Sequence, residues 1–383
     1  MDAMFSNGHA EKAPPLPNDT ERWYLPIFGV YHHRKKDKVR VVFDSAAKCN
    51  GVSLNDVLLP GPDLTNSLLG ILLRFRLEPV AVVADIQQMF YSFKVDEHHR
   101  DYLRFLWHEQ YDINKPLTEY RMCVHIFGNT ASPSIASYGL KQSAMRSNLG
   151  SDVTHFVLND FYVDDGLTSL PTATKAVNLL INKKTQEALI TEGKLRLHKI
   201  ASNREREDRP YSRRGVLSTI NSIFDPLGFL APVVVEGRLI QRQLINSTSD
   251  WDQPLPTEYF DTWNRWTSSL QELDQLHIRR TYLSDSFSKS EEKSVHIFCD
   301  ASEKAIAAVS FVRARNNAGQ FELGFLHGKS KVAPVHGHTI PRLELCSAVL
   351  ATEIADTIAH QLQLPLKEFK FYTDSKVVLG YII

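Results

Sequence analysis

Three aspartates of this sequence lie where their carboxylates could share divalent metal ions. Asp85 directly follows the apolar run from Val80 to Ala84, and Asp164 and Asp165 stand together just before a glycine. A short valine-rich run predicts a buried strand, and an Asp-Asp-Gly sequence after apolar residues predicts a tight turn between two strands. A rigid sheet fixes the direction of side chains at such positions, so the three carboxylates can be held at one point.

Carboxylates held at one point suit the transfer of a phosphoryl or nucleotidyl group. That reaction uses two divalent ions about 4 Å apart, which bind the attacking and leaving oxygens. Magnesium prefers hard oxygen ligands, and proteins usually supply a few carboxylates beside the phosphates of the substrate. The stretch between Asp85 and Asp164 is long enough for a connecting helix and a second strand. An isolated Asp-Asp-Gly is more often only a turn, so the pattern alone leaves a metal site and a plain turn equally open.

Three acids in the last quarter of the chain form a second candidate set. Asp300 ends one predicted strand, Asp374 ends a later one, and Glu344 stands one turn into a predicted helix that begins at Pro341. Two strand ends and a helix start can converge on a single metal pair. The predicted elements of this region are, in order, strands at 295–299, 305–312 and 321–325, a helix from 341 to 358 and a strand at 369–373.

The composition bounds the class of protein but not its partner. Among 383 residues, hydrophobic side chains make up 43% and charged ones 23%, an ordinary balance for a globular protein of two or three domains. Lysine plus arginine equals aspartate plus glutamate, 44 against 44. Any surface for nucleic acid must therefore be a local patch, and the run HHRKKDKVR at 32–40 is a candidate. A solvated charged run is the equally open alternative.

Cysteine spacing and apolar content favour an intracellular protein. The four cysteines are too far apart in sequence for a zinc site, which fits a reducing compartment. The N-terminal residues lack the apolar core of a signal peptide, and no apolar run reaches membrane-spanning length. We therefore expect a cytoplasmic protein that does not insert into a membrane.

Other patterns predict helices, breaks and a loose N-terminus. Residues 1–22 are polar and proline-rich, which predicts a mobile segment. The remaining predictions are helices at 64–76 and 172–190, a strand at 155–163, a charged break at 202–214 and a linker rich in serine, lysine and glutamate at 284–293.

Six sequence motifs, taken in order, resemble the reverse transcriptase of the BEL/Pao class of LTR retrotransposons. They run over most of the chain. The resemblance indicates that the chain is a fragment of a pol polyprotein. The motifs are KVRVVFDSAAKCNGVSLNDVLLPGP (38–62) for the fingers, ADIQQMF (84–90) for the first palm motif, FGNTASPSIAS (127–137) for template and nucleotide binding, FYVDDGL (161–167) for the Tyr-x-Asp-Asp box, GKLRLHKIASN (193–203) for the lysine motif, and IFDPLGFLAP (223–232) for the connector.

The resemblance implies a role for each matching residue. Asp85 and Asp164 would bind two Mg²⁺ ions, or Mn²⁺ in their place, with Asp165 as the supporting carboxylate. Phe90 would be the steric gate that excludes a ribose 2′-hydroxyl, although plain core packing is the simpler interpretation of that residue. The other implied nucleotide-binding residues are Arg40, which would pair with the triphosphate, Phe127 and Gly128 beside the incoming base pair, and Lys199 at the leaving group.

The implied fold class is α+β. It comprises fingers and palm of the DNA/RNA polymerase superfamily at 23–205, a helical connector at 206–290, and an incomplete RNase H-like α/β domain at 291–383. The implied function is RNA-directed DNA polymerase, a nucleotidyltransferase, in a particle-associated retroelement protein. Its partners would be an RNA template, a DNA primer, the RNA–DNA hybrid and deoxynucleoside triphosphates, and the resemblance predicts no oligomeric state.

Two departures from the family pattern keep alternatives open. The segment between Asn203 and Ser212 is short for the hairpin that grips a primer, and positioning is most of the catalysis in phosphoryl transfer. The chain ends at Ile383, before the final carboxylate and histidine loop of an RNase H, so the carboxylates Asp300, Glu344 and Asp374 are expected to form an incomplete nuclease site. A catalytically impaired remnant that only binds nucleic acid is therefore the alternative, and a metal-binding structural protein is a third.

Overall fold

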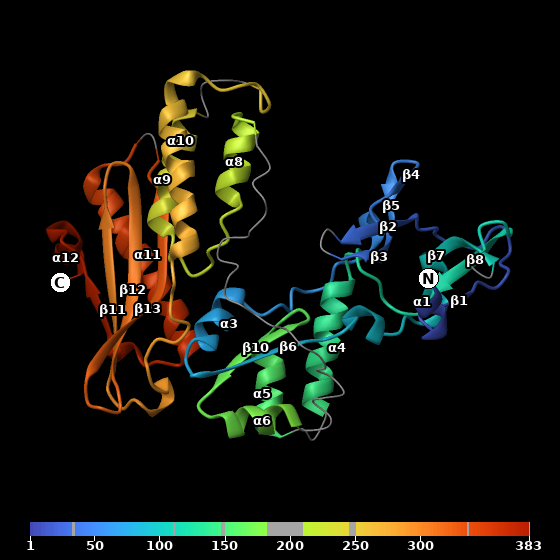
Figure 1. Cartoon of the computed structure of the whole chain (residues 1–383), viewed down its shortest axis with the longest axis horizontal. Coiled ribbons are helices and arrows are strands. Elements are labelled where there is room, and N and C mark those ends of the chain that lie inside the picture. The colour runs from blue at the N-terminus through green and yellow to red at the C-terminus, as the bar shows by residue number, and fades with distance from the viewer. Residues whose placement is uncertain are drawn as a thin grey trace. The chain divides into compact units, whose positions relative to one another are not determined.

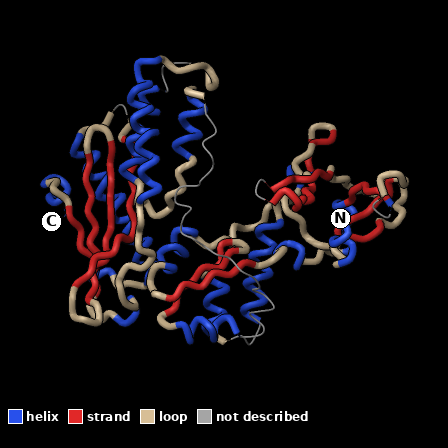
Figure 2. The backbone as a smooth tube through the Cα atoms, viewed as in Figure 1, coloured by secondary structure: helices blue, strands red, loops and turns tan. Residues whose placement is uncertain are grey.

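The structure, a computed structural model, describes residues 1–32, 35–109, 112–146, 150–181, 210–244, 250–334 and 337–382. These residues form two compact units. The first unit consists chiefly of Met1–Asn66 and Ala84–Gly166, and the second of Ser67–Val83, Leu167–Leu179 and the described residues from Pro210 onward. Figures 1 and 2 show the strands and helices of both units.

A three-stranded antiparallel sheet forms the N-terminal part of the first unit. Its strand order is β1 (Ala10–Lys12), β8 (Leu117–Met122) and β7 (Arg104–His108), and helix α1 (Asp2–Ser6) precedes it. Met4 and Ala10 are buried in one core with Phe105 and Met122. The first 22 residues, for which the sequence predicts a mobile segment, therefore hold a helix and a strand. Only a few apolar side chains anchor this helix and strand. They lie among proline and polar residues, so the sequence pattern does not indicate that they are buried.

Two hairpins and a short helix follow in the first unit. Strands β2 (Ile27–His32) and β3 (Lys35–Phe43) pair antiparallel, as do β4 (Lys48–Cys49) and β5 (Val52–Ser53). Asn50 and Gly51 join β4 to β5 with φ of 52° and 84°, the two positive values that a type I′ turn requires. Helix α2 (Leu54–Val57) begins at Ser53, whose side chain and backbone exchange hydrogen bonds with Asp56 in a capping box.

The segment that holds the first carboxylate set is a three-stranded sheet of order β6 (Val80–Asp85), β10 (Asp165–Leu170) and β9 (Phe161–Tyr162). In the first unit this segment continues into the 3₁₀ helices η1 (Met89–Ser92) and η2 (Glu97–Leu103) and the helices α4 (Ser132–Arg146) and α5 (Ser151–Asn159). The strand predicted at 155–163 is wrong for most of its length. Val153, Phe156 and Val157 are the buried residues of α5, and their spacing is that of one helix face.

A four-stranded sheet dominates the second unit (Figure 2). Its order is β13 (Phe321–Val332), β12 (Ala305–Arg315), β11 (Lys293–Ala301) and β14 (Phe369–Tyr372), with β11 and β14 parallel and the other pairs antiparallel. Helix α11 (Ile340–Leu362) packs on one face, where Leu350, Ile354 and Ile358 join the buried core (Figure 1). The strand, strand, strand, helix, strand order predicted for this region is confirmed, and helix α12 (Lys376–Ile382) follows it.

Helices make up the rest of the second unit. Helices α8 (Arg213–Asn221), α9 (Ala231–Leu244) and α10 (Phe260–Ser269) share a core in which Trp263 and Trp266 are buried. The 3₁₀ helices η4 (Thr257–Tyr259) and η5 (Leu270–Gln275) flank α10. Helices α3 (Leu68–Phe75) and α6 (Ala173–Ile181) and the 3₁₀ helices η6 (Phe287–Lys289) and η7 (Leu366–Glu368) complete the described elements.

The segment predicted as a linker at 284–293 is packed instead. Ser286 and Phe287 are 7% and 5% exposed. The buried Glu78 carboxylate accepts hydrogen bonds from the Ser286 hydroxyl at 2.5 Å and from the Ser288 backbone N–H at 2.9 Å. Serine, lysine and glutamate make this segment look solvated in the sequence, but a distant carboxylate satisfies its polar groups.

The motif DPLGF at 225–229 docks on the sheet of the second unit. The Asp225 carboxylate accepts hydrogen bonds from the backbone N–H groups of Gly228, Phe229 and Leu230, which closes the turn. Gly228 has φ of 79°, and a Cβ added there would lie 1.7 Å from the carbonyl oxygen of Gly328 on β13. Glycine is therefore required twice over, by its φ and by the close approach of a second backbone.

Among the described residues, none of the helices combines the length and the apolar character needed to cross a lipid bilayer.

Candidate functional site

The first carboxylate set lies at a strand end and an adjoining hairpin turn. Asp85 is the last residue of β6, and the backbone N–H of Ile86 donates a 3.0 Å hydrogen bond to the carbonyl oxygen of Asp164. Asp165 pairs with Tyr162 across the hairpin, which leaves Val163 and Asp164 as the two residues of the turn. The two chain segments that carry the three aspartates are thus joined directly.

Val163 has an unusual backbone conformation at this turn. Its φ is 57°, a value that β-branched residues rarely adopt. The Val163 side chain packs against the cluster of Met89, Phe90 and Ala136. Packing of the side chain stabilises the turn despite the strain of the backbone, and such strain is found where a functional group must be held in one place.

The three carboxylates influence one another electrostatically. Desolvation raises the pKa of Asp85 above its usual value, and the charge of Asp164 raises it further. Desolvation also raises the pKa of Asp165, and the charges of Asp164 and Asp85 add to that shift. Carboxylates that repel one another in this way are stabilised by a shared cation.

The donor set fits a hard divalent cation, although its side chains are not arranged as a closed cage. All its oxygens are carboxylate oxygens, which Mg²⁺ prefers. In the part of the chain that the structure describes, no three His, Cys, Asp or Glu side chains are grouped as a complete metal-ligand set. Magnesium in phosphoryl-transfer sites usually takes only one or two protein carboxylates beside substrate phosphates and water, so an open set is compatible with that use.

Phe90 and Phe127 lie against each other in the first unit. Their ring centroids are 4.3 Å apart at an interplanar angle of 74°, an edge-to-face contact. Phe90 is only 4% exposed and belongs to the cluster that includes Val163, whereas Phe127 is 59% exposed. Phe90 therefore fills a core position and also connects the exposed ring of Phe127 to the turn that carries Asp164.

Gly128 follows Phe127 with φ of 100°. A Cβ added to Gly128 would lie 3.3 Å from the carbonyl oxygen of Phe43, at the end of β3. The predicted need for glycine here is thus explained within the protein by φ and by the approach of β3, before any ligand is considered.

The remaining nucleotide-binding candidates are described only in part. Arg40 lies on β3 opposite Val30, and its side chain is exposed. Lys199 and the whole motif at 193–203 lie outside the described residues, as does the segment between Asn203 and Ser212 apart from its last two residues.

The second carboxylate set gathers at one end of the sheet of the second unit. Phe298 on β11 pairs in parallel with Tyr372 on β14, so Asp300 and Asp374 each lie two residues beyond a paired position. The charges of both aspartates act on Cys299, whose thiol pKa is raised chiefly by burial. The hydroxyl of Ser375, next to Asp374, donates a hydrogen bond to the Glu344 carboxylate. Asp300 and Asp374 therefore lie at neighbouring strand ends, and a hydrogen bond from the residue after Asp374 reaches Glu344 near the start of α11, although no three acids of the described residues are grouped as a metal-ligand set.

Sequence reasoning missed several polar residues that hold the first unit together near the carboxylates. Asn55 contacts the loop at Gly128 and Thr130, and Asn66 donates to the carbonyl oxygens of Leu158 and Phe161 beside the hairpin. A capping-box pattern around Asn55 was visible in the sequence, but nothing in it indicated the partner loop.

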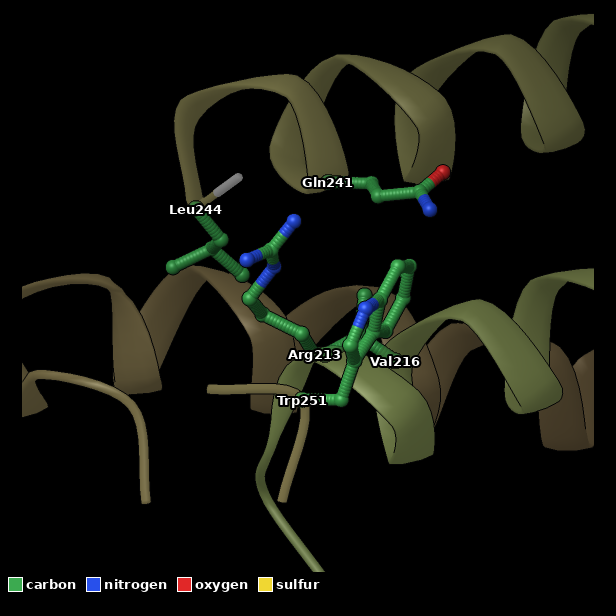
Figure 3. Close-up of a pocket in the computed structure, with 5 residues that line it drawn as sticks. All are labelled: Arg213, Val216, Gln241, Leu244 and Trp251. Atoms are coloured by element: carbon green, nitrogen blue, oxygen red, sulfur yellow. The ribbon is translucent and has the colours of Figure 1, made fainter. Parts of the chain in front are cut away.

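A small pocket lies between helices α8 and α9 and the segment at Trp251, and its lining includes none of the six predicted acids. Figure 3 shows the Arg213 side chain rising from α8 beside the Trp251 ring, toward Gln241 and Leu244 of α9. The guanidinium carbon lies 4.6 Å from the centroid of that ring, a cation–π contact. Without an acid in its lining, this pocket does not suit metal-dependent chemistry.

Part of the chain matches a known family. Residues 212–375 match the family described as the Pao retrotransposon-like RNaseH-like domain. This match confirms, over these residues, the resemblance to the Pao class that the sequence indicated, and it covers helices α8, α9 and α10 and most of the C-terminal sheet. No match was found among curated proteins.

Solved structures of foamy viral protease-reverse transcriptase share the fold. One, in complex with double-stranded DNA, is 16% identical, covers 98% of this chain and 68% of its own, and has a TM-score of 0.63. A complex with an RNA/DNA hybrid is 14% identical, with coverage of 98% and 52% and a TM-score of 0.57. A further double-stranded DNA complex is 15% identical, with coverage of 98% and 81% and a TM-score of 0.59. The fold is thus a mixed α/β fold like that of a retroviral reverse transcriptase with an RNase H-like domain, and the division into fingers, palm and connector stays a prediction.

Proposed function

We propose that this retroelement protein, which is related to reverse transcriptases and carries a Pao-type RNase H-like domain, is an RNA-directed DNA polymerase with Asp85, Asp164 and Asp165 in its active site. One observation carries the proposal. Burial and neighbouring carboxylate charges raise the pKa values of Asp85 and Asp165, at a strand end and a hairpin turn that a backbone hydrogen bond joins. Mutual repulsion of this kind is costly unless the group binds cations.

In this proposal the chain contributes position and charge. Asp85 and Asp164 would hold two Mg²⁺ ions, or Mn²⁺ in their place, with Asp165 as the supporting carboxylate. When bound, the ions would neutralise charge on the triphosphate and lower the pKa of the primer hydroxyl. The strained turn at Val163 and its packing against Phe90 would keep the Asp164 carboxylate at a fixed position while the substrate binds.

The nucleotide and the nucleic acid complete the proposed site. The exposed Phe127 ring, supported by Phe90, offers an apolar surface to a base or a sugar. Arg40 is a candidate for the triphosphate because a guanidinium pairs well with phosphate oxygens. An RNA template, a DNA primer and their hybrid are the proposed partners, since the foamy viral relatives were solved with double-stranded DNA and with an RNA/DNA hybrid.

A second candidate function is cleavage of RNA in a hybrid. It rests on the positions of Asp300 and Asp374 at neighbouring strand ends and on the hydrogen bond that links Ser375 to Glu344 near the start of α11. In this proposal the three carboxylates would hold metal ions that activate water, as the polymerase set would for a hydroxyl. Hydrolysis of a labelled hybrid that Asp300→Asn abolishes would support it, and hydrolysis unaffected by that variant would refute it.

The primary test is primer extension on an RNA template with Mg²⁺. We expect Asp164→Asn to lower incorporation by about 10²-fold or more, because a charge is removed from the reacting centre. Asp152→Asn is the matched control, since Asp152 is an exposed aspartate of α5 in the same unit and should leave incorporation unchanged. Incorporation that survives Asp164→Asn would refute the proposal.

The remnant hypothesis predicts binding without turnover. Salt-dependent binding of an RNA–DNA duplex, with no incorporation by the wild-type chain at any Mg²⁺ or Mn²⁺ concentration, would favour it over the polymerase. Binding of Mg²⁺ with deoxynucleoside triphosphate would in turn separate both from a purely structural metal protein.

A further inference from the structure

We propose that Asn55 is a positioning residue for the incoming nucleotide, acting through the loop of Phe127 and Gly128. This inference rests on the proposed polymerase function and assigns a role to the fingers motif at 38–62. Asn55 itself need not touch the substrate. Its side chain would set the backbone from which the exposed Phe127 ring projects.

The side-chain amide of Asn55 binds the backbone of the loop on both sides of Asn129. Its Nδ2 donates to the carbonyl oxygen of Gly128 at 2.8 Å, and its Oδ1 accepts from the backbone N–H of Thr130 at 2.9 Å. One donor and one acceptor are used together, as a neighbouring strand would use them. The Asn55 side chain thus makes the two hydrogen bonds to the loop that the backbone of a neighbouring strand would otherwise make.

Asn129, between these two contacts, is tied to the same brace. The hydroxyl of Ser45 donates to the Oδ1 of Asn129 at 2.5 Å, and both residues are buried. The backbone N–H of Asn55 in turn donates to the carbonyl oxygen of Ser45 at 3.1 Å. Residues 44–56, which we call the brace, therefore contact three consecutive residues of the loop.

The brace is itself rigid. Its hairpin is closed by the turn at Asn50 and Gly51, and its helical turn by the capping box of Ser53 and Asp56. Leu54 is 2% exposed and anchors the turn in the core of the first unit. Asn55 is therefore presented to the loop in a fixed orientation, which is what a positioning residue needs.

The loop needs this support because Phe127 is poorly packed. The ring is 59% exposed and meets Phe90 edge to face. Phe90 packs in one cluster with Val163, beside Asp164. A shift of the Phe127–Gly128 backbone would therefore alter the surface on which a nucleotide is proposed to lie, whereas neither of the two Asn55 side-chain contacts involves a carboxylate of the first set.

The test measures single-nucleotide incorporation by the full chain on an RNA-templated primer, with kcat and KM determined separately. Asn55→Ala removes both loop contacts. Asn55→Asp keeps the acceptor for Thr130 but places a carboxylate oxygen against the Gly128 carbonyl. We expect both to raise the KM for deoxynucleoside triphosphate by about tenfold with kcat within about twofold, because each loses a hydrogen bond outside the reacting centre.

Asn114→Ala is the matched control. Asn114 is an asparagine of the same unit whose amide donates to Asp112 in an exposed turn, and its replacement should leave KM unchanged. An unchanged KM in a folded Asn55 variant overturns the inference, and so does a fall in kcat alone. If both Asn55 variants are unfolded at the assay temperature, the residue is structural and the inference is wrong. A wild-type chain without incorporation refutes the polymerase proposal itself, which is a different result.

Discussion

The backbone N–H of Ile86 donates a hydrogen bond to the carbonyl oxygen of Asp164 at 3.0 Å. Ile86 directly follows Asp85, so this bond fixes the distance between the two chain segments that carry the first carboxylate set. It also explains how the charge of Asp164 can raise the pKa of Asp85, although the two residues lie far apart in the sequence.

Removing one carboxylate charge should stabilise the protein when divalent cations are absent. The pKa of Asp165 is raised in the folded state. Between its ordinary value and the raised one, the folded state binds more protons than the unfolded chain, so stability falls as pH rises through that window and stays lower above it. We expect Asp165→Asn to raise the melting temperature at pH 7 in a chelator, and to reduce the stabilisation gained on adding Mg²⁺. A lower melting temperature in the chelator, with Asp152→Asn unchanged, would contradict the assigned repulsion.

A substitution of Phe90 would distinguish a steric gate from plain core packing. Phe90→Val keeps an apolar side chain in the buried cluster but shortens it, so we expect a loss of stability of about 1–2 kcal/mol. If the ring also limits the sugar, incorporation of ribonucleotides relative to deoxyribonucleotides should rise by about tenfold or more. Primer extension with each nucleotide and denaturant unfolding measure the two effects. Reduced stability with unchanged sugar discrimination would leave Phe90 a core residue only.

Gly228 should tolerate no side chain. Gly228→Ala would place its Cβ 1.7 Å from the Gly328 carbonyl oxygen, so β13 or the DPLGF turn must move. We expect a loss of more than about 2 kcal/mol in the free energy of unfolding of the second unit.

Gly319 is the matched control, because it has the same φ of 79° but its nearest neighbours are Arg315 side-chain nitrogens 3.8 Å from an added Cβ. Gly319→Ala should therefore show only the cost of the backbone conformation, about 1–2 kcal/mol. Equal losses in urea unfolding would argue against the collision.

Glu322 should make the second unit sensitive to acid. The Ser284 hydroxyl, with Asn316, the Ser284 backbone N–H and Arg279, lowers the pKa of Glu322 to about 2. The folded state thus binds fewer protons than the unfolded chain between about pH 4.5 and 2. The associated stability is present above that window and is lost as pH falls through it, on the order of 2 kcal/mol. Unfolding free energies measured from pH 6 to 2 should fall less steeply for Glu322→Gln, and parallel curves for the two proteins would refute this assignment.

Regular patterns in the sequence predicted the elements that carry the acids. The valine-rich run before Asp85 is β6, and the strand predicted at 295–299, before Asp300, is β11. Such patterns work because one face of a strand or helix is buried over its own length, so the signal is local. The strand expected at 155–163 was wrong because this apolar run has no alternation. Such a run does not distinguish a buried strand from a helix such as α5.

Contacts between distant segments were not predictable in this way. Glu78 binds the segment at Ser286, and Met4 is buried beside β8. The sequence predicted a linker around Ser286 and a mobile segment around Met4, because both stretches are polar. A polar side chain can be satisfied by solvent or by a distant partner, and the local sequence is the same in either case. Only the path of the chain decides between the two.

By itself, the sequence determined which acids end strands or stand in turns, the order of elements in the C-terminal sheet and the resemblance to the Pao class. Tertiary structure decided that Asp85 and Asp164 are joined through Ile86, that Phe90 supports Phe127, and that Asn55 holds the loop after it. The division has a physical reason. Secondary structure follows from burial patterns within one segment, whereas these contacts join residues many positions apart and depend on packing of the whole unit.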